Sequence, residues 1–106
     1  MTQPILDRLF TTILDRRGGD PATSYTTSLF AKGPPVIARK VGEEAVELVI
    51  AAMQDDRNTV IKESADLLYH LMVLWADGGI SPADVLAELE RREGTSGLAE
   101  KAARKG

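Results

Sequence analysis

Two short acidic runs, at positions 43–47 and 63–66, are the part of this 106-residue sequence best suited to chemistry. The first run reads Glu-Glu-x-x-Glu and the second reads Glu-x-x-Asp, and both lie in stretches whose apolar residues recur at helical spacing. Residues three or four apart are neighbours on a helix, so each run projects carboxylates from one side. Mg²⁺ and Mn²⁺ prefer oxygen ligands, and Mg²⁺ is commonly held by carboxylates together with substrate phosphates. The runs therefore indicate a cation site formed from Glu43, Glu44, Glu47, Glu63 and Asp66.

Either acidic run taken alone is equally typical of a solvated helix face. Two runs on consecutive helices, each beside a strongly apolar stripe, favour the cation site. Close like charges cost roughly a few tenths of a kcal/mol per pair, and a bound cation would offset that cost. Such a cation would neutralise phosphate oxygens and lower the pKa of a bound water, which makes hydroxide available near neutral pH.

Lys40 and His70 lie close to the acids along their helices and allow two interpretations each. Lys40 precedes Glu44 by four residues, so it is either a helix salt-bridge partner or a contact for a substrate phosphate. Arg39 and Lys32 are weaker candidates of the same kind. His70, the only histidine, lies one turn beyond Asp66. It is either a packed core residue or a group that hydrogen-bonds to a ligand carboxylate and orients it.

Helices must position these acids, because the chain carries no strand pattern. Apolar periodicity, with Gly-Gly pairs at 18–19 and 78–79 and Gly94 as stops, predicts four helices, at 4–17, 34–54, 58–76 and 82–93. Residues 20–33 show no sustained period and are predicted as a loop with one helical turn at its end. Loops of this length in a small domain are frequently functional.

The two acid-bearing helices are predicted to face one another as an all-α hairpin joined by a short turn. Their expected buried stripes are Val41, Ala45, Leu48, Val49 and Ala52 in the first helix, and Val60, Ile61, Ser64, Leu67, Leu68, Leu71, Leu74 and Trp75 in the second. Four short helices are too thin a bundle to cover so much apolar surface. We therefore expect a homodimer in which two such hairpins share a core.

The composition excludes several other classes of protein. A balance of 13 Lys and Arg against 16 Asp and Glu gives a net charge of −3, which does not suggest a nucleic-acid-binding protein. The absence of cysteine excludes disulfides, thiol nucleophiles and zinc-thiolate sites. No signal peptide is discernible, and no stretch approaches the ~20 apolar residues that a membrane span needs. We expect a cytoplasmic, single-domain protein over 1–94, followed by a basic tail over 95–106 that is partly disordered.

Several phrases of the sequence resemble a known family. They are the segments 24–26, 40–47, 63–71 and 86–92, and together they extend over most of the chain. The acidic phrases look like the metal-binding signature of the all-α nucleoside-triphosphate pyrophosphohydrolases, the MazG-like superfamily. Within that superfamily, the full set of phrases resembles the phosphoribosyl-ATP pyrophosphohydrolase family. The resemblance implies a MazG-like four-helix fold whose bundle is completed by dimerisation.

The resemblance also implies an activity and roles for individual residues. The reaction would be the second step of histidine biosynthesis, the Mg²⁺-dependent hydrolysis of phosphoribosyl-ATP to phosphoribosyl-AMP and pyrophosphate, with Mn²⁺ as a possible substitute. Glu43 and Glu47 are the catalytic candidates, with Glu43 either a further ligand or the base for the attacking water. The implied metal ligands are Glu44, Glu47, Glu63 and Asp66, and the implied substrate-binding residues are Lys40, Ser24, Tyr25, Thr26 and His70.

Two other functions are compatible with the same residues. A house-cleaning nucleotide pyrophosphohydrolase of the same superfamily would share the metal site and differ in the pocket for base and sugar. A non-catalytic helical interaction module would carry the acids only as solubilising groups. Turnover of phosphoribosyl-ATP compared with other nucleotides, and the effect of neutralising an acid, separate these functions from the expected one.

Overall fold

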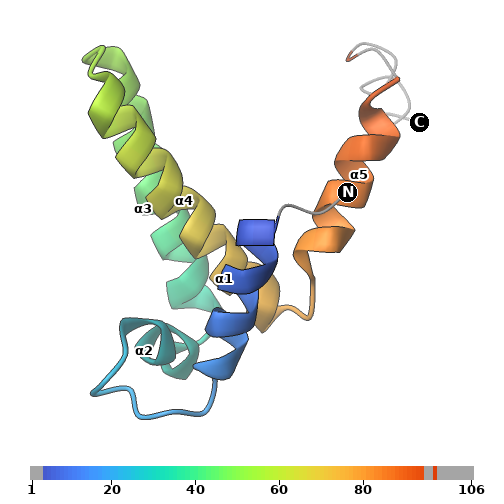
Figure 1. The fold of residues 1–106 in the computed structure, drawn as a ribbon. Helices are drawn as coiled ribbons and strands as arrows, with labels where there is room; N and C mark the ends of the chain where they lie inside the picture. The colour runs from blue at the N-terminus through green and yellow to red at the C-terminus, as the bar shows by residue number, and fades with distance from the viewer. Residues whose placement is uncertain (1–3, 95–96, 98–106) are drawn as a thin grey trace.

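Five helices make up the protein in a computed structural model that describes residues 4–94 and residue 97 (Figure 1). They are α1 (Pro4–Asp15), α2 (Tyr25–Lys32), α3 (Pro34–Met53), α4 (Arg57–Asp77) and α5 (Pro82–Arg92). No strand is present among those residues, so the predicted all-α class is confirmed. The predicted basic tail lies outside the described residues, apart from Gly97.

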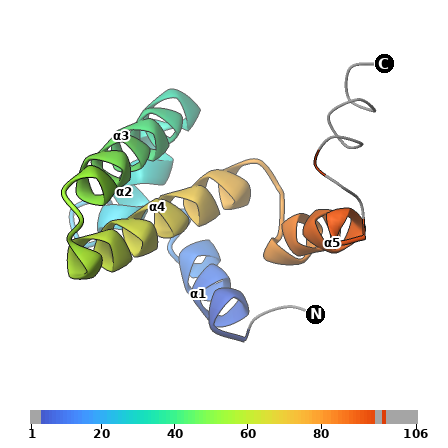
Figure 2. The same cartoon turned by 90° about the horizontal axis from the view of Figure 1, so that it is seen from above.

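The long helices α3 and α4 form the predicted hairpin, and they lie side by side in both views (Figures 1 and 2). Pro34 and Pro35 begin α3, where their missing N–H groups leave no helical hydrogen bond unmade. Asp56 begins α4 and accepts a hydrogen bond from the N–H of Thr59 at 3.3 Å. A turn of only three residues, 54–56, reverses the chain between the two helices and brings their acidic runs to the same level.

The core lies at the end of the hairpin away from this turn. There α1 packs against α4, and α2 packs against both α3 and α4. The buried cluster draws on all four helices and consists of Ile13, Leu29, Ile37, Met72, Val73 and Ala76. This packing fixes the position of α2 and of the preceding loop relative to the acids of α4.

The helix α2 lies within the stretch that the sequence predicts as a loop. Ser24 caps it by accepting a hydrogen bond from the N–H of Thr27 at 3.2 Å, and Leu29 is buried in the core. A helix of eight residues is marginal without tertiary contacts, so its apolar periodicity is too short to reveal it. The long loop therefore shrinks to residues 16–24, which connect α1 to α2.

The predicted buried stripes are only partly correct for the single chain. In α3, Val49 is 61% exposed, and in α4, Ile61 and Leu68 are 52% and 39% exposed. The buried residues of α4 are instead His70, Met72, Val73 and Ala76. The reason is that α1 and α2 cover only the lower part of the hairpin, while its turn end extends beyond them (Figure 1).

Helix α5 lies apart from the α3–α4 hairpin, beyond the C-terminal end of α4 (Figures 1 and 2). Ser81 and Asp84 form a capping box at its first turn, with hydrogen bonds of 3.2 Å and 2.9 Å. Within the described part of the chain, none of the helices combines the length and the apolar character that crossing a membrane requires.

Candidate active site

The hairpin brings three of the predicted acids into one cluster. Carboxylate oxygens of Glu44, Glu63 and Asp66 all lie within 4.8 Å of one another. Glu44 faces α4 and is only 9% exposed, whereas Glu63 and Asp66 face α3 from adjacent turns of α4. Three acids at such distances repel one another unless protons or a cation lie among them. We call these three residues the acid cluster.

The electrostatics of the acid cluster suit a hard cation. Burial raises the pKa of Glu44, and the neighbouring Glu47 carboxyl raises it further. Burial likewise raises the pKa of Glu63, with Glu47 and then Asp66 adding to the effect. Among the described residues, Oε2 of Glu44 and Oε2 of Glu63 are buried and have no hydrogen-bond donor. Carboxylate oxygens that lack donors are the ligands that Mg²⁺ and Mn²⁺ prefer.

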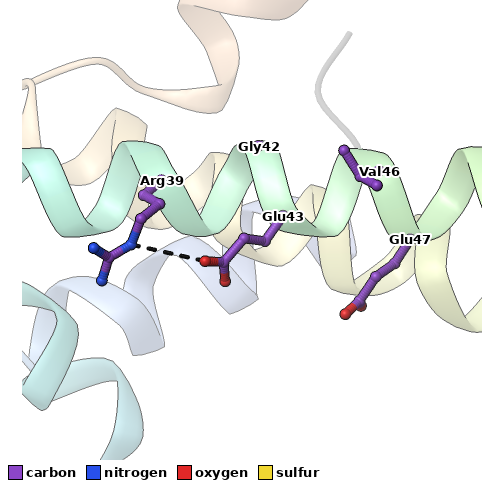
Figure 3. A pocket seen from close by; sticks show the side chains of 5 residues that line it. All are labelled: Arg39, Gly42, Glu43, Val46 and Glu47. Carbon is purple, nitrogen blue, oxygen red and sulfur yellow. Dashed lines mark ion pairs between the residues drawn. The ribbon is translucent and has the colours of Figure 1, made fainter.

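Glu47 lies on the exposed side of α3 but close to the acid cluster. It is not one of the three residues whose oxygens are all within 4.8 Å, although its charge acts on both Glu44 and Glu63. Figure 3 shows that Glu43 and Glu47 project from the same side of α3. Both line an open hollow of about 630 Å³, so solvent can reach Glu47 without any rearrangement of the helices.

Glu43 does not join the acid cluster. Its carboxylate is held by Lys40 Nζ at 3.3 Å and by Arg39 Nε at 3.7 Å, the second contact being drawn in Figure 3. The hydrogen bond to Glu43 is the main cause of the raised pKa of Lys40, to which the charge of Tyr25 contributes next. Lys40 thus forms its helix salt bridge with Glu43 and not with Glu44, four residues further on, and this bridge keeps the ammonium group beside the acids.

His70 connects α4 to the beginning of α2. It is 6% exposed, and its Nδ1 lies 2.8 Å from the main-chain carbonyl oxygen of Asp66. Because a carbonyl only accepts, Nδ1 carries the hydrogen, and Nε2 accepts from the Tyr25 hydroxyl at 2.8 Å. The histidine is therefore packed and hydrogen-bonded, and its bond to Asp66 goes to the main chain rather than to the carboxylate.

A second side-chain bond ties α2 to α4, between the hydroxyls of Thr26 and Tyr69. With the bond between Tyr25 and His70, it fixes the first turn of α2 beside Asp66. Ser24 completes this arrangement as the cap of α2. The three residues of the predicted Ser-Tyr-Thr motif are thus brought to the edge of the acid cluster.

A polar pocket of about 460 Å³ opens between α1, residues 23–26 and α4. Asp66 and His70 line it, so it adjoins the acid cluster directly. The pocket also contains Thr12, Arg16 and Tyr69, which the sequence did not indicate as functional residues. No spacing in the sequence links the end of α1 to the acids. Only the packing of α1 on α4 brings Arg16 to this pocket.

Comparisons with known proteins indicate the family to which the chain is similar. The family model described as phosphoribosyl-ATP pyrophosphohydrolase matches residues 6–93. A phosphoribosyl-ATP pyrophosphatase of Rhizorhabdus wittichii is 69% identical over 99 residues, which are 93% of each chain. The corresponding protein of Azospirillum brasilense is 61% identical over 95% of this chain and 91% of its own. The phosphoribosyl-ATP pyrophosphatase of Parvibaculum lavamentivorans is 63% identical over 93% of this chain and 91% of its own.

Proposed function

The chain belongs to the phosphoribosyl-ATP pyrophosphohydrolase family, and we propose that it hydrolyses phosphoribosyl-ATP to phosphoribosyl-AMP and pyrophosphate. This reaction is the second step of histidine biosynthesis. The observation that carries the proposal is the acid cluster, in which two buried carboxylate oxygens lack a hydrogen-bond donor. A cation held by such a cluster would bind the phosphates of a polyphosphate substrate. Buried carboxylates, by contrast, would add little to the solubility of the protein.

We propose that Glu44, Glu63 and Asp66 hold Mg²⁺, with Mn²⁺ as a substitute and with Glu47 as the fourth ligand. When bound, the cation would neutralise phosphate oxygens and make a water more acidic. The donor set fits this ion, since all four side chains offer carboxylate oxygens and no sulfur or imidazole is among them. Binding would also offset the burial and the repulsion that together raise the pKa of Glu44 and Glu63.

We propose roles for Glu43 and Lys40 beside this ligand set, and a second, catalytic role for its member Glu47. Glu47 is exposed on the side from which substrate enters, so it is better placed than Glu43 to take a proton from the attacking water. Glu43 is occupied by Arg39 and Lys40, and it would hold the Lys40 ammonium group where a substrate phosphate can reach it. We therefore propose a positioning role for Glu43, as a third possibility beside the ligand and base roles that the resemblance implies.

The substrate beyond the triphosphate would lie in the polar pocket next to Asp66. Ser24, Tyr25, Thr26 and His70 form its wall, and the hydrogen bonds within this wall hold it in place without any ligand. A preformed wall lowers the entropy cost of binding. These residues are our proposed substrate-binding set, together with Lys40.

A homodimer is a further part of the proposal. Apolar side chains near the turn end of the hairpin are half exposed or more, with Val49, Ile50, Met53 and Ile61 at 61%, 50%, 83% and 52%. A second copy of the hairpin would cover them, and the shared core would stabilise both chains. Light scattering after size-exclusion chromatography tests this directly, and a monomer at micromolar concentration would contradict it.

The decisive experiment for the proposed reaction is pyrophosphate release from phosphoribosyl-ATP, measured with Mg²⁺, with Mn²⁺ and with a chelator. We expect turnover with either metal ion and none with the chelator. ATP and modified nucleoside triphosphates serve as comparison substrates. Preference for these nucleotides would indicate the house-cleaning function, and no turnover of any substrate would favour the interaction module.

A further inference from the structure

The polar pocket beside Asp66 contains one side chain with a permanent positive charge among the described residues that line it, that of Arg16. We propose that Arg16 binds the 5-phosphate of the substrate's phosphoribosyl arm and thereby distinguishes phosphoribosyl-ATP from ATP. The inference rests on the proposed function, since it assigns one end of that substrate to one wall of the pocket.

Arg16 is available for a ligand. It follows the last residue of α1 and is exposed, and its guanidinium group has no hydrogen bond or ion pair with any part of the chain that the structure describes. Its main chain, by contrast, is fixed, because the Arg16 carbonyl accepts a 2.7 Å hydrogen bond from the hydroxyl of Thr27. The adjacent Arg17 is already engaged, since its Nη1 donates to the Ala76 carbonyl oxygen at 3.1 Å and its guanidinium lies 5.3 Å from the Phe30 ring centroid. The structure thus holds the base of Arg16 firmly and leaves its charge unpaired.

The rest of the pocket suits a sugar phosphate. Thr12, Thr23 and Ser24 line it together with Arg16. The Ser24 hydroxyl accepts from the Thr27 N–H and keeps its own hydrogen for a phosphate oxygen, whereas the hydroxyls of Thr12 and Thr23 donate to main-chain carbonyls and can accept from ribose hydroxyls. An arginine presents a planar fork of N–H groups that fits two phosphate oxygens at once. The volume of about 460 Å³ falls within the usual range for small-molecule sites, and is ample for a pentose phosphate.

The position of the pocket agrees with the shape of the substrate. Asp66 belongs both to the acid cluster and to the pocket, so a molecule whose triphosphate lies at the cluster can continue into the pocket. Phosphoribosyl-ATP carries a phosphate at each end, one as the reacting triphosphate and one as a monoester on the second ribose. ATP has no such monoester. A cation in this pocket that binds the monoester therefore contributes binding energy to only one of the two nucleotides.

The experiment compares Arg16→Gln with Arg8→Gln, which removes the same charge two turns earlier on α1 and outside the pocket. Initial rates of pyrophosphate release are measured for phosphoribosyl-ATP and for ATP in the presence of Mg²⁺. We expect Arg16→Gln to lower kcat/KM for phosphoribosyl-ATP by about ten- to a hundredfold, mainly through KM, because one charged hydrogen-bond partner is lost. The rate on ATP should not change, and Arg8→Gln should resemble the wild type on both substrates. Arg16→Lys should recover part of the loss, since it restores the charge without the fork.

Ribose 5-phosphate supplies a second measurement that does not depend on any activity towards ATP. It should compete with phosphoribosyl-ATP for the wild type and for Arg8→Gln, and it should compete at least about tenfold more weakly for Arg16→Gln. Ribose without a phosphate should not compete at the same concentrations. Circular dichroism should give the same thermal midpoint for the wild type and Arg16→Gln, which separates lost binding from lost folding.

Three results would overturn the assignment of Arg16. Unchanged kinetics of Arg16→Gln on phosphoribosyl-ATP would show that the residue does not bind this substrate. Equal losses on phosphoribosyl-ATP and ATP would place Arg16 at the triphosphate they share. Ribose 5-phosphate inhibition that is the same in wild type and variant would exclude a contact with the monoester. A wild type that does not hydrolyse phosphoribosyl-ATP would instead refute the proposed function itself, and the substrate assignment of the pocket with it.

Discussion

The glutamates of this protein fall into two opposite environments. In the acid cluster, Glu44 and Glu63 are forced together with Asp66, and the pKa of both glutamates is raised, chiefly by burial. On α5, Glu88 lies beside two arginines, and hydrogen bonds from Arg91 and then Arg92 lower the pKa of Glu88 to about 2. The same side chain thus destabilises the fold at one place and stabilises it at the other. Only the first arrangement needs an additional positive charge to become favourable.

This difference separates carboxylates that stabilise the fold from carboxylates that we propose bind a ligand. Asp56 is of the first kind, since its hydrogen bonds with Thr59 lower its pKa and begin α4. A chain that gains nothing from repelling acids would pair them as it pairs Glu88. That the hairpin instead buries unpaired oxygens of Glu44 and Glu63 is the strongest sign of a cation.

The largest expected effect comes from removing one charge of the acid cluster. Glu63→Gln keeps the size of the side chain and leaves the helix intact, but it replaces a charged ligand oxygen by an amide. We expect Mg²⁺-dependent kcat/KM on phosphoribosyl-ATP to fall at least about a hundredfold, the upper range for weakening a metal site. The measurement is pyrophosphate release at saturating Mg²⁺.

Glu88→Gln is the matched control for Glu63→Gln, because it makes the same substitution in the other environment. Its turnover should equal that of the wild type. If both variants lose activity to a similar extent, the comparison between the two environments fails, and the loss reflects the fold. If neither does, Glu63 is not a ligand.

The next effect is stabilisation by the metal ion itself. A cation that binds only the assembled acid cluster raises the unfolding free energy by mass action, about 2.7 kcal/mol at a concentration one hundred times Kd. In a domain of this size each kcal/mol corresponds to a midpoint change of about 4–8 °C. Thermal melts between zero and 10 mM Mg²⁺, about the useful range for a weak carboxylate site, should show the rise in the wild type. A flat midpoint in the wild type would mean that the site forms only with substrate phosphates present.

Without metal ions, the repulsion and burial of the acid cluster should give a smaller effect, a loss of stability as the pH rises. Because the pKa of Glu44 is raised in the folded state, the folded protein holds this proton more tightly than the unfolded chain does. The stability that Glu44 contributes is complete below its pKa in the unfolded chain, about 4.3. This contribution declines as the pH rises from there through its pKa in the folded protein. Glu44→Gln removes that decline, so in chelator at pH 7 its thermal midpoint should exceed that of the wild type, while near pH 4 the two should converge. A midpoint below the wild type's at pH 7 would show that Glu44 is satisfied by partners within the chain.

The acid cluster could be anticipated from the sequence because its geometry is local. Acids three residues apart share a helix face, and a short turn between two helices leaves few ways to arrange them. The environments of Glu43 and Glu47 could not be predicted in the same way. Spacing alone does not show that Arg39 and Lys40 pair with Glu43 while Glu47 stays exposed.

The polar pocket could not be anticipated, because it depends on contacts between residues far apart in the sequence. Arg16 and Asp66 are fifty positions apart and meet only through the packing of α1 on α4. The same reason explains why the predicted burial of Ile61 and Leu68 is wrong for the single chain. Periodicity identifies which residues share a face, but the extent of the covering helices decides whether that face is buried within one chain.

The smallest expected effect concerns Glu88, the glutamate that is paired with arginines on α5. The lowered pKa of Glu88 means that its stabilisation is present above the unfolded value of about 4.3 and is lost as the pH falls towards its folded value of about 2. Glu88→Gln should therefore lower the midpoint slightly at pH 7 and progressively less as the pH falls through about 2, whereas Glu44→Gln should raise the midpoint at pH 7. The decrease should also shrink in 1 M salt, where the screening length is about 3 Å, because this ion pair is exposed to solvent. If Glu88→Gln and Glu44→Gln instead shift the midpoint in the same direction at pH 7, the two environments do not differ in the way their charges are balanced, and the case for a cation among the cluster acids weakens accordingly.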